Sequence, residues 1–109
     1  MTKIIFTKKN GRIINVECSG HTGYAVEEED VVCAALSSIV QTAVLGVLGV
    51  AKVNAEYRTD AEKGELSLKI PEDITAKQRE AVGIILDTLL LGATDLHEGF
   101  SDFIELEVK

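Results

Sequence analysis

The sequence predicts an α+β fold, a two-layer sandwich in which two helices pack on one face of a five-strand, mainly antiparallel sheet. Five short segments alternate apolar with polar residues, as strands do when only one sheet face is buried. Two longer segments repeat their apolar residues with helical periodicity. The segments follow one another in the order ββαββαβ, and the 109 residues suit a single domain, 1–109.

The first two strands, Lys3 to Lys8 and Arg12 to Cys18, are predicted to form a hairpin. The dipeptide Asn10-Gly11 between them is typical of a type I′ turn, because both central residues of that turn have positive φ. Alternation along the second strand places its inward-facing residues on one face, and we expect Cys18 to be a core thiol. That inward face consists of Ile14, Val16 and Cys18.

A loop over residues 20–29 is expected to lead into a helix that begins at Asp30, a good N-cap residue, and runs to about Val50. The stretch from Val31 to Ala51 is 21 residues without a charge, long enough to span a bilayer. Polar and glycine residues interrupt it at helical spacing, so we expect a buried central helix and no membrane partner. These residues are Ser37, Ser38, Gln41, Thr42, Gly46 and Gly49.

The second half of the chain predicts two further strands, Val53 to Arg58 and Glu65 to Ile70, then a helix and a last strand, Phe103 to Val108. Thr75 and Gln78 have the spacing of a capping box at the start of this second helix. Its apolar stripe has the spacing of a helix that lies on a sheet. The stripe consists of Val82, Ile85, Leu86, Leu89, Ala93 and Leu96.

Charge and cysteine content restrict the classes of partner and compartment. A net charge of −7 argues against direct nucleic-acid binding and favours a basic partner. Two cysteines are too few for a disulfide framework; one bridge between Cys18 and Cys33 is the alternative, but we expect reduced thiols. Residues 1–6 lack the basic and apolar regions of a signal peptide, and a cytoplasmic location is therefore expected.

Residues suited to covalent chemistry are concentrated in one segment, where His21 precedes Cys33 by 12 positions. With Asp30 as N-cap, Cys33 would be the third helical residue, where the positive end of the helix dipole lowers the pKa of a thiol. A neighbouring imidazolium lowers it further, as in cysteine hydrolases. Gly20 and Gly23 around His21 allow close approach of a peptide, and loop movement could complete the pair when substrate binds.

A polar stripe runs along the predicted first helix with spacings of three, four and four residues. It consists of Asp30, Cys33, Ser37 and Gln41. Because the helix is otherwise apolar, these side chains need polar partners, which the preceding loop could supply. Asp30 is also the one nearby candidate for a third catalytic residue, although an N-cap side chain is occupied by backbone N–H groups.

The run GHTGYAVEEEDVVCAALS, from Gly20 to Ser37, resembles the signature of the ribosomal-processing cysteine protease family. That signature joins a Gly-His-x-Gly-Tyr loop to a helix that starts Asp-[Ile/Val]-Val-Cys-Ala-Ala-[Val/Leu]-Ser. The resemblance implies that Cys33 is the nucleophile and His21 the base, and that Gly20, Asp30 and Ser37 support the site. Members often have a glycine just before the aspartate, where this chain has two glutamates.

The resemblance also implies an endopeptidase that removes an N-terminal extension from ribosomal protein twenty-seven of the large subunit. It implies a homodimer and an enzyme without cofactor or metal. An acidic enzyme that acts on a basic ribosomal protein agrees with the charge of this chain.

Three alternatives remain. The chain could be a non-catalytic, ribosome-associated binding module in which the motif only shapes a groove. It could be a thiol redox enzyme, with Cys33 peroxidatic and an exposed Cys18 as the resolving thiol. It could hold a metal between Cys18, His21, Cys33 and His97, although that spacing is unlike the paired ligands of structural zinc sites. We expect His97 instead to be a solvated residue at a helix end.

Overall fold

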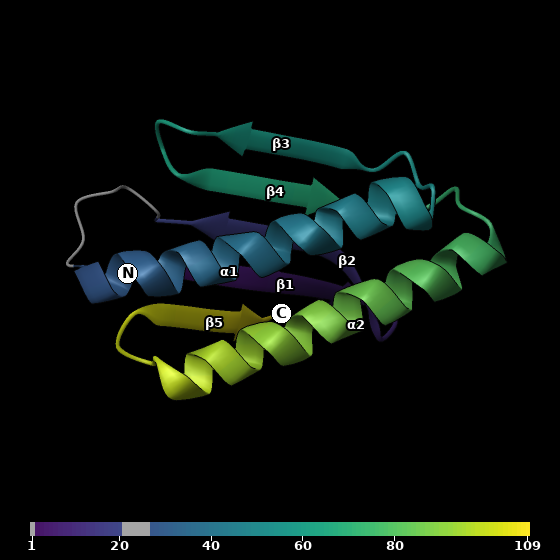
Figure 1. Ribbon diagram of the computed structural model, residues 1–109. Helices are drawn as coiled ribbons and strands as arrows, with labels where there is room; N and C mark the ends of the chain where they lie inside the picture. The colour runs from purple at the N-terminus through teal and green to yellow at the C-terminus, as the bar shows by residue number, and fades with distance from the viewer. Residues whose placement is uncertain (1, 21–26) are drawn as a thin grey trace.

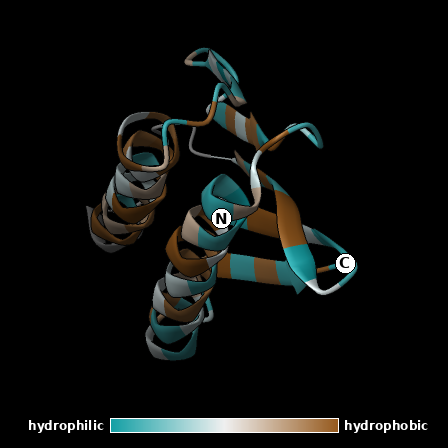
Figure 2. Ribbon diagram, turned by 90° about the vertical axis from the view of Figure 1, so that its right-hand side faces the viewer, coloured by the Kyte–Doolittle hydropathy of each residue, from teal (hydrophilic) through white to brown (hydrophobic). Residues whose placement is uncertain are grey.

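The computed structural model describes residues 2–20 and 27–109, and it has the predicted two-layer architecture (Figure 1). Five strands form one sheet in the order β3-β4-β2-β1-β5. Figures 1 and 2 show both long helices on the same side of that sheet. The elements are β1 (Thr2–Lys9), β2 (Arg12–Ser19), α1 (Glu27–Leu45), the π-helical turn η1 (Gly46–Val50), β3 (Glu56–Asp60), β4 (Glu65–Lys69), α2 (Ala76–Gly99) and β5 (Ile104–Val108).

The sheet is mainly antiparallel, as predicted. Strand β1 pairs with β2 in antiparallel and with β5 in parallel orientation, and β4 pairs with β2 and β3 in antiparallel orientation. Strands β3 and β5 are the two edges, so β1, β2 and β4 carry most of the core beneath the helices. The inner face of β1 shows this plainly, because Ile4 and Phe6 are fully buried.

The first hairpin confirms the turn prediction and corrects the face of one strand. Asn10 and Gly11 have φ of 55° and 76°, as a type I′ turn requires. Thr7 pairs with Asn15 but Lys8 pairs with Ile13, which leaves Ile14 as the extra residue of a β-bulge. The prediction that Ile14 faces inward with Val16 and Cys18 is therefore wrong: Ile13 is buried and Ile14 only half-buried.

Helix α1 begins at Glu27, three residues before the predicted start. Glutamates are good helix formers, and their charge is favourable at the positive end of a helix. Residues 27–29, expected to be loop, therefore form the first turn. Asp30 is the fourth helical residue rather than the N-cap, and Cys33 is the seventh rather than the third. The dipole argument for Cys33 is weakened, because the effect declines beyond the first turn.

Helix α1 is buried on one face only, whereas the sequence predicted a buried central helix. Its inner residues, among them Leu36 and Val40, pack on the sheet, but Val31 and Leu45 are 65% and 69% exposed. By length and composition the stretch Asp30–Val50 could cross a membrane, with 39% of its most apolar window buried. Core helices of soluble proteins pass the same test, and this helix covers a sheet.

The second half of the chain agrees with its predicted caps and corrects one strand. Thr75 Oγ1 accepts a hydrogen bond from Gln78 N at 3.0 Å, and Gln78 Oε1 accepts one from Thr75 N at 2.9 Å, which confirms the capping box. Strand β3 begins at Glu56 rather than Val53. Val53 is buried and donates its N–H to Val47 O of η1, so it follows the helix end instead of joining the sheet.

Candidate active site

Cys33 lies in the second turn of α1 and faces the sheet, with 2% of its surface exposed. Its sulfur shares a hydrogen bond with the hydroxyl of Thr2, the first residue of β1. Thr2 is fully buried, and its backbone N–H donates to Phe103 O at 3.0 Å. The strand that contacts the Cys33 thiol is therefore itself fixed by the segment that leads into β5.

Cys18, the second thiol, lies on the inner face of β2 and is 7% exposed, which confirms it as a core residue. It pairs with Ile4, two residues along β1 from Thr2, so Cys18 and Thr2 are diagonal neighbours on one face. Burial raises the pKa of the Cys18 thiol to about 11, and negative charge on Cys33 also raises it. Both cysteines are free. A buried, protonated thiol is poorly suited to the resolving role of the redox alternative.

A groove of about 280 Å³ lies between α1 and the β3–β4 hairpin. Ser37 and Gln41 of the predicted polar stripe line it from α1, and Cys18 reaches it from β2. Cys33 precedes Ser37 by four residues, one helical turn along the same stripe. The hairpin, rather than the preceding loop alone, therefore faces this polar stripe. The residues of the hairpin that line the groove are Thr59, Asp60, Ala61, Gly64, Glu65 and Leu66.

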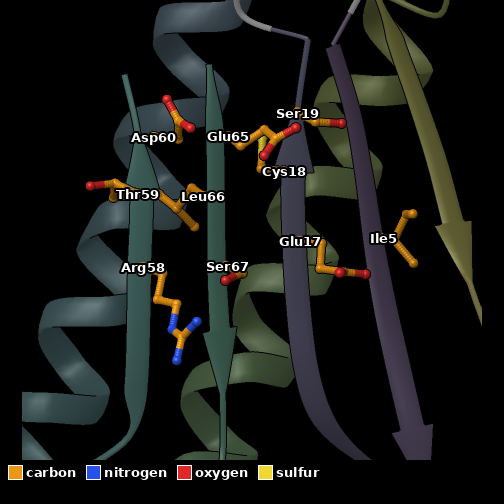
Figure 3. Close-up of a pocket in the computed structure, with 10 residues that line it drawn as sticks. All are labelled: Ile5, Glu17, Cys18, Ser19, Arg58, Thr59, Asp60, Glu65, Leu66 and Ser67. Carbon is orange, nitrogen blue, oxygen red and sulfur yellow. The ribbon is translucent and has the colours of Figure 1, made fainter. Parts of the chain in front are cut away.

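A larger cavity, of about 500 Å³, opens on the sheet face that carries no helix (Figure 3). It shares Cys18, Asp60 and Glu65 with the groove, so the two hollows adjoin at one end of the hairpin. Glu17 adds a third carboxylate, and Arg58 is already paired with Glu56 at 2.5 Å. The cavity is acidic, and the thiol in its lining is Cys18, a residue of the inner sheet face that also lines the groove. The groove is the candidate site because Ser37, one helical turn after Cys33 on α1, lines it.

The structure brings some of the predicted supporting residues to this region. Gly20 follows β2 with φ of 92°, a left-handed conformation that favours glycine. Ser37 is half-buried in the groove, and Asp30 is half-buried one turn before Cys33 on α1. Asp30 thus lies inside the helix rather than at its cap, and its supporting role stays a prediction.

His21 and Gly23 lie outside the described residues, as does most of the predicted loop. The placement of the His21 imidazole beside the Cys33 sulfur therefore stays a prediction from the sequence. Within residues 2–20 and 27–109, no three His, Cys, Asp or Glu side chains are grouped as a metal site.

Two residues have roles that the sequence analysis did not assign. Thr2 contacts Cys33, the candidate nucleophile. The sequence indicated this only by placing a polar residue at an inward position of the alternation Thr2, Ile4, Phe6. His97 was expected to be solvated, but it is half-buried, and its Nδ1 is hydrogen-bonded to Ile104 O at 2.8 Å. This correction arises because the end of α2 packs against the start of β5.

Comparison with known proteins agrees with the resemblance of the sequence motif. The model of the family described as cysteine protease Prp matches residues 1–105. The chain belongs to the cysteine protease Prp family. A ribosomal processing cysteine protease Prp of Bacillus subtilis (strain 168) is 21% identical over 90 residues, which cover 83% of this chain and 80% of that protein.

Two solved structures of the Prp protease from S. aureus share the fold. One, in complex with a substrate peptide, has a TM-score of 0.88 at 20% identity; the other, with a covalently linked product peptide, has a TM-score of 0.84 at 21% identity. In both comparisons the match covers 100% of each chain. Like the other members of the Prp family, this chain is a cysteine protease.

Proposed function

We propose that this Prp-family chain is an endopeptidase in which Cys33 is the nucleophile and His21 the general base. The observation that carries the proposal is the position of Cys33, which follows the family-like Gly20–Tyr24 run and lies one helical turn before Ser37, a residue that lines the groove. Cys18 is the competing thiol, and its pKa of about 11 keeps it protonated near neutral pH. Thiolate is the attacking species, so Cys18 is poorly suited to be the nucleophile.

In this mechanism His21 takes the proton of the Cys33 thiol, and the thiolate attacks the scissile carbonyl carbon. The C–N bond breaks as His21 returns the proton to the leaving amine, and a thioester remains on Cys33. His21 then takes a proton from water, whose oxygen attacks the thioester carbon; the C–S bond breaks, the acid product leaves, and His21 returns the proton to the Cys33 sulfur. The covalently linked product peptide of the S. aureus protease is in line with this covalent route.

The proposed substrate is the N-terminal extension of ribosomal protein twenty-seven of the large subunit. Support comes from the sequence resemblance and from the B. subtilis relative, which is a ribosomal processing protease. Asp60 and Glu65 on the groove wall, with a net charge of −7, suit a lysine-rich polypeptide. The S. aureus protease forms a complex with a substrate peptide, and we propose that the groove of this chain likewise binds a peptide.

We also propose a cytoplasmic homodimer that associates through the outer face of the helices. An apolar hollow of about 510 Å³ lies between α1 and α2, with Ile39 and Ile85 among its lining residues. Around it, Ile84 and Leu91 are 64% and 74% exposed. An apolar surface of this kind on a small protein is typical of an interaction site. The free thiols of Cys18 and Cys33 suit a reducing compartment.

Mass spectrometry of an extended ribosomal protein incubated with the enzyme tests the proposal. Wild type should produce one shortened product and the released extension, whereas Cys33→Ser should bind the precursor without cleaving it. Cys18→Ser is the matched control and should still cleave. Binding without cleavage by the wild type would favour the non-catalytic module, and full cleavage by Cys33→Ser would exclude Cys33 as the nucleophile.

A further inference from the structure

Thr2 is an unusual occupant of its place in the fold. Among the described residues it is the one polar side chain that is buried in the core, with 0% of its surface exposed. Ile4 and Phe6, which occupy the next inward positions of β1, are both apolar. Valine has nearly the shape of threonine and is equally suited to a strand, so packing and strand propensity do not call for a hydroxyl here.

The partner of that hydroxyl is the Cys33 sulfur. A buried hydroxyl needs a hydrogen-bond partner, and Oγ1 of Thr2 finds it in Sγ of Cys33, where either atom can be the donor. The pair joins residues 31 positions apart, the start of β1 and the second turn of α1. The contact therefore depends on the packing of the helix on the sheet.

In the position where it contacts Thr2, the Cys33 sulfur is too buried to attack a peptide. With 2% of the residue exposed, the sulfur faces the sheet and not the groove. A cysteine side chain has three staggered positions about χ1, and only one of them is used in the Thr2 contact. A sulfur that attacks a peptide has to leave that position.

We propose that Thr2 is a positioning residue, whose hydroxyl holds the Cys33 thiol in a buried resting position that the sulfur leaves when it attacks. The inference rests on the proposed role of Cys33 as nucleophile. It gives the free enzyme a thiol that is withheld from small electrophiles until a substrate draws the sulfur toward the groove. Thr2 acts through Cys33 and does not itself touch the substrate.

The first measurement is the S–H stretching band in the Raman spectrum of the full-length protein. Cys18→Ser and Cys33→Ser assign the two thiol bands. We expect the Cys33 band of wild type to be displaced from the frequency of a free thiol, to stay displaced in Thr2→Ser and to return toward the free value in Thr2→Val. A wild-type Cys33 band at the free-thiol frequency would overturn the proposal, even if Thr2→Val did not fold.

The second measurement is the rate at which iodoacetamide modifies each cysteine, resolved by mass spectrometry. Loss of one neutral hydrogen bond should speed alkylation of Cys33 by about threefold to tenfold in Thr2→Val, while Thr2→Ser stays slow. Thr7→Val, on the outer face of β1, is the matched control and should behave as wild type. The Cys18 rate reports general opening of the fold and should not change.

An unchanged Cys33 rate in Thr2→Val, or equal acceleration of both cysteines, would contradict the positioning role and leave Thr2 as a packing residue. Neither measurement uses the ribosomal precursor. Failure of the proposed protease function would therefore appear as cleavage by Cys33→Ser, independently of the Thr2 result.

Discussion

Burial raises the pKa of the Cys18 thiol on β2, and a negative charge on Cys33 of the facing helix α1 raises it further. The two thiols nevertheless have different surroundings. The Cys33 sulfur has the Thr2 hydroxyl as a partner, and burial is the main cause that raises the pKa of Cys18. Both thiols are buried, Cys18 at 7% and Cys33 at 2% exposed, so the polar partner and not the degree of burial distinguishes the surroundings of Cys33.

The first prediction concerns the pH dependence of stability. The pKa of Cys18 rises from 9.0 to about 11 on folding, so the folded state holds this proton to higher pH than the unfolded chain. The associated stabilisation is fully present below about pH 9 and is lost as pH rises through 11, with a magnitude of about 2–3 kcal/mol. Urea unfolding of wild type and Cys18→Ala should show a stability difference that shrinks over this range. A pH-independent difference would contradict the burial of this thiol.

The second prediction is that His21→Ala lowers the rate of precursor cleavage by about 10²- to 10⁴-fold, the usual contribution of a general base. Its melting temperature should stay close to that of wild type. His97→Ala is the matched control: loss of the bond to Ile104 O should lower stability with little change in the rate per folded molecule. Normal cleavage by His21→Ala would remove His21 from the dyad.

The third prediction follows from the position of Asp30 inside α1. Because Asp30 is not the N-cap, Asp30→Asn and Asp30→Ala should both keep the free energy of unfolding within about 0.5–1 kcal/mol of wild type. Thermal melts of the two variants provide the comparison. Destabilisation by Ala alone would restore the capping role that the sequence suggested, whereas equal loss of cleavage in both folded variants would assign the carboxylate to the site.

The fourth prediction tests whether the acidic groove wall recognises a basic substrate. Glu65→Gln should raise KM for the precursor several-fold at low salt, with kcat nearly unchanged, and the difference should shrink as salt is added. Glu80→Gln on α2 makes the same change of charge at an exposed position outside the groove. Equal effects of the two substitutions would indicate a response to net charge rather than to the groove.

The fifth prediction addresses association through the helical face. Ile84→Glu places a charge at a position that is 64% exposed beside the hollow between α1 and α2, and sedimentation should then show a monomer where wild type is a dimer. Val108→Glu on β5, 48% exposed, is the control and should leave the dimer intact. A dimer that survives Ile84→Glu would place the interface elsewhere.

Features with local causes could be predicted from the sequence, and features set by competition between segments could not. Asn10-Gly11 and the Thr75–Gln78 cap depend on a few adjacent residues, and both were predicted correctly. The start of α1 depended on whether three glutamates extend a helix or a loop. The bulge at Ile14 interrupts the alternation on which strand faces are assigned.

The same distinction applies to the candidate site. Cys33 and His21 could be proposed from the sequence because their motif is contiguous in the chain. The Thr2 contact and the groove formed with the β3–β4 hairpin join segments that are remote in sequence, and alternation alone could identify only a polar residue in an inward position. Sequence thus predicted the reacting groups, whereas the fold showed what surrounds the Cys33 thiol.

The parallel pairing of β1 with β5 has a consequence for the order in which the enzyme matures. β1 is synthesised first, but its β5 neighbour and the Phe103 carbonyl that holds Thr2 are synthesised more than a hundred residues later. Pairing over such a separation forms late in folding. A nascent chain that already contains the complete His21–Cys33 motif therefore still lacks the strand that fixes Thr2. Maturation of the thiol site should therefore await translation of β5, so a truncated chain that lacks β5 would carry the whole motif without the completed site.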